Sequence, residues 1–309
     1  MTLFYYDPIV LEHNTGNHPE CARRLRTVMQ RLDQADVLKS FTRPEWNDVT
    51  EEQVHRVHTA ETLDSIQRFI ARGGGQIEQD TIVSEKSWQA ASRASGAACD
   101  AVRRVLEGED RNAFCLMRPP GHHAMHQHPM GFCLINHIAI AARSAIQALN
   151  LNRVLIIDWD VHHGNGTQAT FWEDPQVAFL SMHRFPFYPG SGDESETGQG
   201  RGAGLTVNLP IEFGTSRQMQ LDRFRNATET LADRFQPELI LLSAGFDSHK
   251  DDPVGCLSLE SEDFITLTDI VMDLADAHCQ GRLVSLLEGG YNPEALAECV
   301  QIHLERLNR

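Results

Sequence analysis

The sequence predicts a single α/β domain built on a mainly parallel β-sheet that is covered by helices on both faces. Short apolar segments alternate with longer amphipathic segments through most of the chain, a pattern typical of a parallel sheet. Polar residues hardly interrupt the apolar segments, which indicates strands buried on both faces. No linker, low-complexity tract or internal repeat divides the 309 residues, so we expect one domain over residues 1–309.

Each element is predicted from its own pattern of apolar residues. An apolar run over residues 3–6 predicts the first strand, and Leu25, Val28 and Leu32 recur at the spacing of an amphipathic helix over residues 21–38. Further helices are expected at residues 50–70, 87–106, 138–149, 216–235, 264–279 and 293–307. Further strands are expected at residues 113–116, 154–157, 177–181, 205–209, 239–243 and 283–287.

Composition and charge narrow the classes of function. Hydrophobic residues make up 41% of the chain and charged residues 23%, which is typical of a soluble globular protein. The formal net charge of −16 argues against a general affinity for nucleic acid or for an anionic membrane surface. The same charge favours a cationic substrate or partner, and it leaves the oligomeric state open.

The cysteines and the N-terminus predict a reducing, cytoplasmic location. The seven cysteines are odd in number and scattered, and no two of them form a Cys-x-x-Cys pair. Neither a disulfide framework nor a thiolate zinc site is therefore indicated. The N-terminus has no basic region followed by an apolar run, and no apolar segment approaches the roughly 20 residues that cross a bilayer.

One stretch changes abruptly from apolar to polar residues. Four aliphatic residues, 154–157, run directly into a segment that is dense in Asp and His. If the extended conformation continues, its period of two places Asp158, Asp160 and His162 on one side of the backbone. The simpler alternative is a strand end at which these side chains only cap turn amides. So much buried polarity favours a bound cation or dense pairing.

Other predicted strands are also followed by unusual polar segments. These segments are residues 118–123, His183, residues 246–247 and residues 288–291. Open parallel sheets place their active sites at the carboxyl ends of the strands, so we expect the segments to meet in space.

Together these segments predict a metal-assisted hydrolase of an amide or ester. A catalytic zinc ion takes three protein ligands, and Asp160, His162 and Asp247 are the natural set. The adjacent His122 and His123 would supply an acid and a base, and Tyr291 would hydrogen-bond a developing oxyanion. Each motif alone has a structural explanation, such as a helix N-cap at Asp247 or a strand-to-helix turn before Tyr291. Separate structural explanations do not account for the occurrence of all these motifs at the ends of strands in one chain.

With these motifs assembled, the chain resembles the zinc-dependent histone deacetylase family, which has the arginase/deacetylase fold. The matching segments, in order and spacing, are residues 118–124, 131–136, 157–166, 189–192, 243–247 and 288–292. Asn165, Phe246 and the His-Pro-Glu at residues 18–20 are similar to the class II branch and its bacterial deacetylase-like amidohydrolases.

The resemblance implies a role for each matching residue. The implied zinc ligands are Asp160, His162 and Asp247. His122 and His123 would share the acid and base work, with His123 as the proton donor to the leaving amine, and Tyr291 would polarise the acyl carbonyl. Asp158 would pair with His122. Asn165 would orient His123 without the charge of a carboxylate, so His123 should be the less basic of the two histidines.

The resemblance also implies a substrate channel and a second cation. Gly131, Phe132 and Tyr188 would line a narrow acyl-lysine channel, Val254 would stand at its rim, and Arg24 would lie at its base. A structural cation, usually potassium, would be held by Asp158, by Ser181 and by the backbone carbonyls of Asp160, His162 and Met182.

Several alternatives stay open from the sequence. The apolar Val254 favours an acyl-lysine peptide or protein, or another small acylated amine, over an acetylpolyamine, but an acetylpolyamine amidohydrolase uses the same chemistry. A non-catalytic module that binds acyl ligands is a third reading. An arginase-like enzyme with two manganese ions is disfavoured, because no Asp lies two residues after Asp247. The ligand set also suits Fe(II), so the identity of the metal is less secure than its position.

Overall fold

The computed structural model describes residues 2–309, and its centre is a parallel β-sheet. Within the described residues this sheet has eight strands in the order β2-β1-β5-β10-β9-β6-β7-β8. All of its pairings are parallel. The strands are β1 Thr2–Tyr5, β2 Phe41–Thr42, β5 Asn112–Cys115, β6 Val154–Asp158, β7 Val177–Arg184, β8 Thr206–Ile211, β9 Leu239–Ala244 and β10 Leu283–Leu287.

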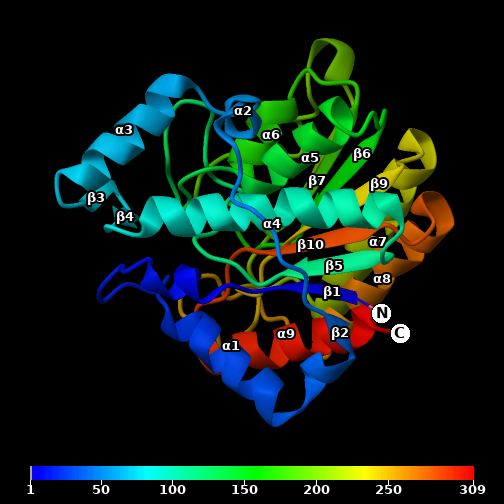
Figure 1. Ribbon diagram of the computed structural model, residues 1–309. Coiled ribbons are helices and arrows are strands. Elements are labelled where there is room, and N and C mark those ends of the chain that lie inside the picture. The colour runs from blue at the N-terminus through cyan, green and yellow to red at the C-terminus, as the bar shows by residue number, and fades with distance from the viewer. Residues whose placement is uncertain (1) are drawn as a thin grey trace.

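Helices cover both faces of the sheet (Figure 1). The helices α4, α5 and α6 pack on one face, while α7, α8 and α9 pack on the other and α1 lies against α9. The α-helices are α1 Arg23–Gln34, α2 Glu51–His55, α3 Ala60–Ala71, α4 Ser87–Glu107, α5 His137–Gln147, α6 Asn165–Phe171, α7 Arg217–Phe235, α8 Asp263–Cys279 and α9 Pro293–Leu307. Short 3-10 helices lie at Pro8–Glu12, Val37–Ser40 and Gly200–Gly202. The predicted fold class is confirmed.

Burial explains why the central segments become strands. Every residue of β6, β9 and β10 is buried, as expected for aliphatic strands that have helices on both faces. The edge strand β8 instead alternates between buried and half-buried residues along much of its length. None of the helices described within residues 2–309 combines the length and the apolar character needed to cross a membrane.

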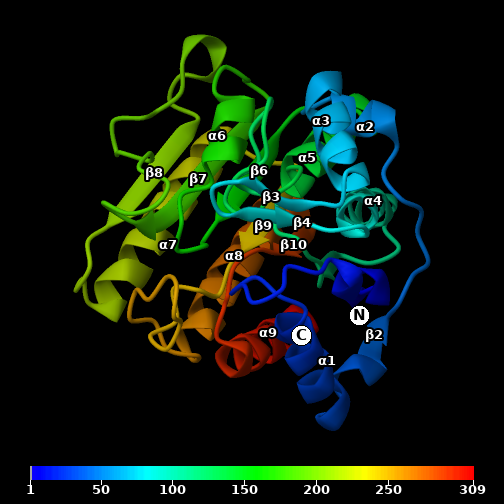
Figure 2. The ribbon, with the colours of Figure 1, turned by 90° about the vertical axis from the view of Figure 1, so that its left-hand side faces the viewer.

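The strand order brings the predicted polar segments together. The strands β5, β10, β9, β6 and β7 are neighbours in the sheet, so the chain segments that follow them begin next to one another at its carboxyl edge. Figure 2 looks onto this edge, where the small hairpin of β3 (Gly75–Glu78) and β4 (Thr81–Val83) lies in front of the strands. The site is therefore built at the place that the sequence predicts.

The N-terminal third differs from the prediction at several points, among them the unpredicted strand β2 and the earlier end of α1. The expected single helix over residues 50–70 is wrong, because α2 ends at His55 and α3 begins at Ala60. The buried His58 separates them, with its imidazole bonded to the Met125 carbonyl and the Asn136 amide. Thr59 then caps α3 by accepting from the Thr62 amide. The β3–β4 hairpin was not predicted, since its short strands are partly exposed and carry polar residues.

Candidate metal-dependent active site

Two consecutive turns place Asp160 and His162, two of the candidate metal ligands. Strand β6 ends at Asp158, so the condition that the extended conformation continues to residue 162 is not met. The Asp160 amide donates to Asp158 Oδ1 at 3.1 Å, and the His162 amide donates to Asp160 Oδ1 at 2.9 Å. Each Asp thus accepts from the amide two residues ahead, which bends the chain. Asp160 and His162 still meet, but through turns rather than through strand periodicity.

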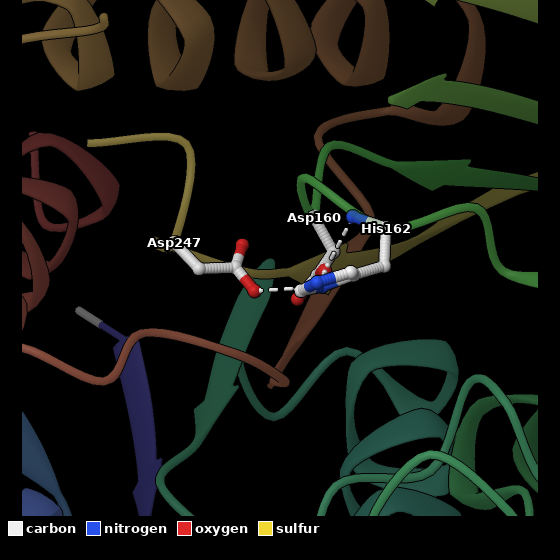
Figure 3. A group of neighbouring side chains, drawn as sticks. All are labelled: Asp160, His162 and Asp247. Carbon is white, nitrogen blue, oxygen red and sulfur yellow. Dashed lines mark hydrogen bonds and ion pairs between the residues drawn. The ribbon is translucent and has the colours of Figure 1, made fainter. Parts of the chain in front are cut away.

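Asp160, His162 and Asp247 form one buried cluster (Figure 3). One possible ligand atom from each residue lies within 4.8 Å of the others. His162 Nδ1 lies 3.0 Å from Asp160 Oδ1 and 3.1 Å from Asp247 Oδ2. Asp247 reaches the cluster from the segment after β9, whereas the other two residues follow β6. The set predicted from the sequence is therefore brought together from neighbouring strands.

The cluster has the properties of a metal site. Asp247 Oδ1 accepts from the Val161 amide, but Asp247 Oδ2 is buried and accepts no hydrogen bond within residues 2–309. A Cβ atom on Gly289 would lie 2.1 Å from that oxygen and 2.5 Å from Asp160 Oδ2, so glycine keeps this space open. Two carboxylates and an imidazole suit zinc and related divalent transition metals. The residues present therefore fit one such ion.

The electrostatics of the cluster show a shortage of positive charge. Burial lowers the pKa of His162, but Asp160 and Asp247 outweigh this effect and raise it to about 9. Burial, and then repulsion by Asp160, raise the pKa of Asp247 to about 7. Without an ion, protons would therefore have to balance the carboxylates. A divalent cation supplies this charge and binds the imidazole in its neutral form.

The two predicted histidines lie side by side next to the cluster. The ring centroids of His122 and His123 are 4.0 Å apart. His122 Nδ1 lies 2.9 Å from Asp158 Oδ2, and His123 Nδ1 lies 2.7 Å from Asn165 Oδ1. Each histidine thus has the partner that the resemblance implies, and His122 Nε2 is 3.9 Å from Asp160 Oδ1.

The partners make the two histidines electrostatically different. Burial lowers the pKa of His122, but Asp158 and Asp160 overcome this effect and hold it well above its ordinary value. Burial, and then the neighbouring His122 and His162, hold the pKa of His123 well below its ordinary value. The neutral Asn165 amide cannot reverse this effect. The order of basicity agrees with the expectation from the sequence.

Tyr291 lies on the turn between β10 and α9, next to Phe132. Its ring packs edge-to-face on Phe132, with centroids 5.6 Å apart, and the Arg24 guanidinium carbon lies 4.8 Å from its centroid. Arg24 is fully buried and donates to the Gly290 and Glu288 carbonyls at 2.6 and 2.5 Å. Arg24 therefore lies beside the Tyr291 ring and supports the turn that carries it.

Aromatic rings surround the histidines and the metal cluster. Tyr188 stands perpendicular to His123 with ring centroids 5.3 Å apart, and it remains 37% exposed. Gly131 packs so closely that a Cβ would lie 2.4 Å from His123 Cδ2, and Phe132 follows with a left-handed φ of 68°. Phe187, which was not predicted from the sequence, stacks on His162 with ring centroids 5.3 Å apart. Phe187 lies in no motif of the sequence, so only its position in the fold shows that it belongs to the site.

The hairpin contributes a second contact that the sequence reasoning missed. Asp80 accepts from the Gly131 amide at 3.0 Å, and Thr81 accepts from the Phe132 amide at 3.1 Å. The Asp80 carboxylate also raises the pKa of the Tyr188 phenol, after the larger effect of burial. The hairpin thus holds the backbone that carries Phe132. Val254 is half-buried in the segment that follows the candidate metal ligand Asp247.

Two buried glutamates also support the site. Glu288 accepts from the Gly121 and His122 amides at 2.7 and 3.2 Å and from the Ser243 hydroxyl at 2.9 Å. Glu20 pairs with both Arg118 and Arg24. Both glutamates lie inside motifs noted in the sequence, but apart from Arg24 their partners are far away along the chain.

The residues expected to hold a structural cation lie in register. Asp158 and Ser181 face each other across β6 and β7, and both are buried. The Ser181 hydroxyl lies 2.9 Å from His183 Nδ1, and Met182, which follows it in β7, is buried as well. The two side chains predicted to supply oxygen ligands, Asp158 and Ser181, therefore lie on the adjacent strands β6 and β7.

Comparisons with known proteins agree with this geometry. A family model described as the histone deacetylase domain matches residues 18–307. The chain is 36% identical over 315 residues to chloroplastic histone deacetylase 14 of Arabidopsis thaliana, a match that covers 96% of this chain and 74% of that protein. It is 33% identical over 331 residues to the histone deacetylase-like amidohydrolase of Pseudomonas aeruginosa, with 99% and 86% covered. The crystal structure of the HDA15 HD domain has a TM-score of 0.92 at 33% identity, covering 99% of this chain and 89% of that chain.

Proposed function

This chain belongs to the histone deacetylase family, and from that premise we propose that it is a zinc-dependent amidohydrolase. Its substrate would be the ε-amide of an acyl-lysine, or a similar small amide, from which it removes an acetyl or another acyl group. The observation that carries this proposal is the buried cluster of Asp160, His162 and Asp247 directly beside the paired His122 and His123. Family membership supports a hydrolase of amides, and the finer assignment rests on these side chains.

The metal ligands would be Asp160, His162 and Asp247. When bound, a divalent metal supplies a Lewis acid that makes water more acidic and polarises a carbonyl oxygen. The buried, water-poor surroundings strengthen each electrostatic interaction of the site. A structural potassium ion near Asp158 and Ser181 would hold the ends of β6 and β7 together from behind.

The two histidines would divide the proton transfers between them. His122, whose charged form is stabilised by Asp158, would hold the proton taken from the attacking water. His123 has no carboxylate partner, and its Nδ1 is held by Asn165, so its Nε2 is left to face the leaving amine. The proton that His122 takes from the water would pass to the leaving nitrogen by way of His123 Nε2, and the weak basicity of His123 would favour its onward release to the amine.

Tyr291 would hold the oxygen that becomes negative as water adds to the acyl carbonyl. A hydrogen-bond donor in such a position typically contributes about 10²–10³ in kcat. Phe132 and Tyr188 would close around the acyl-lysine stem and exclude water from the reacting amide. Val254 is apolar, which supports a neutral acyl amide as substrate over an acetylpolyamine. Hydrolysis of either substrate is the same class of reaction. Asn165, Phe246 and the His-Pro-Glu segment favour the class II branch.

Turnover of an acetyl-lysine fluorogenic peptide tests this proposal. Metal-stripped protein should be inactive and should recover with about one equivalent of Zn²⁺. Tyr291→Phe should lower kcat about 10²–10³-fold at unchanged metal content. Tyr6→Phe, on a half-buried tyrosine outside the site, is the matched control and should retain activity.

Three outcomes would contradict parts of the proposal. No turnover by the zinc-loaded protein, with acetyl-peptide binding retained, would favour a non-catalytic acyl-binding module. A metal content near two per chain would favour an arginase-like site. If N-acetylputrescine is hydrolysed in preference to the acetyl-lysine peptide when both are present, the substrate class would be acetylpolyamines.

A further inference from the structure

We propose that Asp252 is the positioning residue of Tyr291, because its single buried carboxylate fixes the Tyr291 turn and the Val254 segment as one unit. The inference rests on the proposed function, in which Tyr291 acts on the acyl carbonyl. Asp252 lies five residues after the metal ligand Asp247, and only 6% of it is exposed. No motif of the sequence assigns it a role.

All four contacts of the Asp252 carboxylate are with backbone amides. Oδ2 accepts from the Tyr291 amide at 2.6 Å and from the Asn292 amide at 3.3 Å. Oδ1 accepts from the Val254 amide at 2.9 Å and from the Gly255 amide at 2.9 Å. One oxygen thus serves the catalytic turn and the other serves the neighbouring segment. Hydrogen bonds to an ionised acceptor are stronger than those between neutral groups.

The Tyr291 turn needs such an anchor, because glycines precede it. Gly289 and Gly290 allow a wide range of backbone conformations, and Gly290 has a left-handed φ of 119°. Asn292 then caps α9 by accepting from the Glu294 and Ala295 amides. The carboxylate of Asp252 therefore also lies at the start of α9, where the helix dipole favours negative charge. These contacts fix the backbone from which the Tyr291 ring projects.

The two hydrogen bonds to Asp252 Oδ1 connect the Tyr291 turn to the segment of Val254 and Gly255. Gly255, whose amide Asp252 holds, accepts from Arg184 Nη1 at 3.0 Å through its carbonyl. The Arg184 guanidinium also lies over the ring of Phe187, which stacks on His162. Asp252 itself is outside the cluster of metal-binding side chains. It therefore acts on the reaction through the position of Tyr291 and not through contact with the reacting atoms.

Asp252→Asn tests this role with almost no change in volume. One carboxylate oxygen becomes an NH₂ donor, which cannot accept from the two amides that it then faces. We expect kcat to fall about 10–100-fold, below the loss expected for Tyr291→Phe, while KM changes less than about threefold. Metal content is measured for each variant, so that loss of the ion is seen separately.

A double-mutant cycle separates positioning from a general structural effect. In the Tyr291→Phe background, Asp252→Asn should lower kcat by less than about threefold, because the group that it positions is already gone. The matched control is Asp251→Asn. Asp251 is the neighbouring carboxylate, with a side chain that is 60% exposed and lies 3.9 Å from His249. This variant should retain wild-type kinetics.

Amide hydrogen exchange gives a readout that needs no turnover. The Tyr291 and Asn292 amides should exchange faster in Asp252→Asn than in the wild type or in Asp251→Asn, measured on a peptide spanning residues 288–296. Unchanged exchange, or an equal fold loss of kcat in both Tyr291 backgrounds, would overturn the proposal. If the wild type proves inactive, the proposed function fails, and the exchange result alone decides whether Asp252 holds the turn.

Discussion

Replacing Glu20 by Gln should destabilise the protein more than almost any other single change of the same size. Glu20 is fully buried and faces two buried guanidinium groups. Its Oε1 accepts from Arg118 Nε at 2.7 Å and from Arg24 Nη1 at 3.1 Å, and its Oε2 accepts from Arg118 Nη2 at 2.7 Å. Gln at this position would leave two buried cations without a counter-charge.

The expected loss can be worked out from these contacts. Removing one partner of a buried ion pair costs about 3–5 kcal/mol, mainly because the remaining charge stays buried. Arg118 keeps two carbonyl partners, Val10 and His13, and Arg24 keeps those of Glu288 and Gly290, so the loss should not exceed this range. At about 2 °C per kcal/mol for a large domain, the Tm should fall by about 6–10 °C.

The chain offers a matched control for this change. Glu52 pairs with Arg56 at the same spacing of four residues as Glu20 and Arg24, but its side chain is 83% exposed. Exposed pairs contribute about 0–1 kcal/mol, so Glu52→Gln should leave the Tm nearly unchanged. Thermal unfolding of both variants at pH 7.5, with metal content recorded, makes the comparison. Equal Tm values for the two variants would refute the reasoning, since the desolvation of Glu20 would then cancel its ion pairs.

The pH dependence of the Glu20 effect has a definite sign. Burial alone would raise the pKa of Glu20, but Arg118 and His13 hold it well below its ordinary value of 4.5. A group whose pKa is lowered by folding stabilises the protein fully above its unfolded pKa. The Tm difference between the wild type and Glu20→Gln should therefore be constant from pH 8 to about 5.5 and shrink only at lower pH.

Two further predictions follow from the buried histidines and from the glycine beside the metal cluster. Burial lowers the pKa of His58 to about 4, of His137 to about 4 and of His303 to about 3, so each stays neutral in the folded state while the unfolded chain binds protons below pH 6.5. The three together should remove about 4 kcal/mol of stability per pH unit between about pH 6 and 4.5, and a urea midpoint that does not change over this range would contradict the prediction. Gly289→Ala should lower the bound metal more than tenfold by elemental analysis, because its Cβ would lie 2.1 and 2.5 Å from the two metal-binding carboxylates. Gly108→Ala, at the exposed end of α4, should cost stability but keep the metal, and equal metal content in both variants would count against the assigned site.

The strands and long helices could be predicted from the sequence because their patterns are local. Mainly aliphatic runs predicted β6, β9 and β10, and regular apolar spacing predicted α4, α8 and α9, mostly to within one or two residues. The break between α2 and α3 could not be predicted in this way. It depends on His58, whose partners Met125 and Asn136 are far along the chain.

The same distinction applies to the site. The residues that carry chemistry stand in dense motifs at strand ends, so the sequence could point to Asp160, His162 and Asp247 before any geometry was known. The residues that only position others are different. Asp80 and Asp252 are single carboxylates in ordinary loop sequence, and their importance comes from backbone amides that the fold brings to them.

The partners of the buried carboxylates indicate where a cation would bind. A buried carboxylate is stable only with a counter-charge or with enough hydrogen-bond donors. Four of these carboxylates at the carboxyl edge of the sheet are satisfied by the chain itself: Glu20 by arginines, Asp158 by His122, Asp252 by four amides, and Glu288 by two amides and a hydroxyl.

Asp160 and Asp247 are the exception in this part of the described chain, because they share one imidazole and one of their oxygens accepts no hydrogen bond. Asp158 begins the same segment and is just as deeply buried, yet its oxygens are taken by His122 and by the Asp160 amide. Among these carboxylates the strongest unmet need for positive charge therefore lies at the point where Asp160, His162 and Asp247 converge. A divalent cation at this point would balance the two carboxylates and leave both neighbouring histidines free for proton transfer.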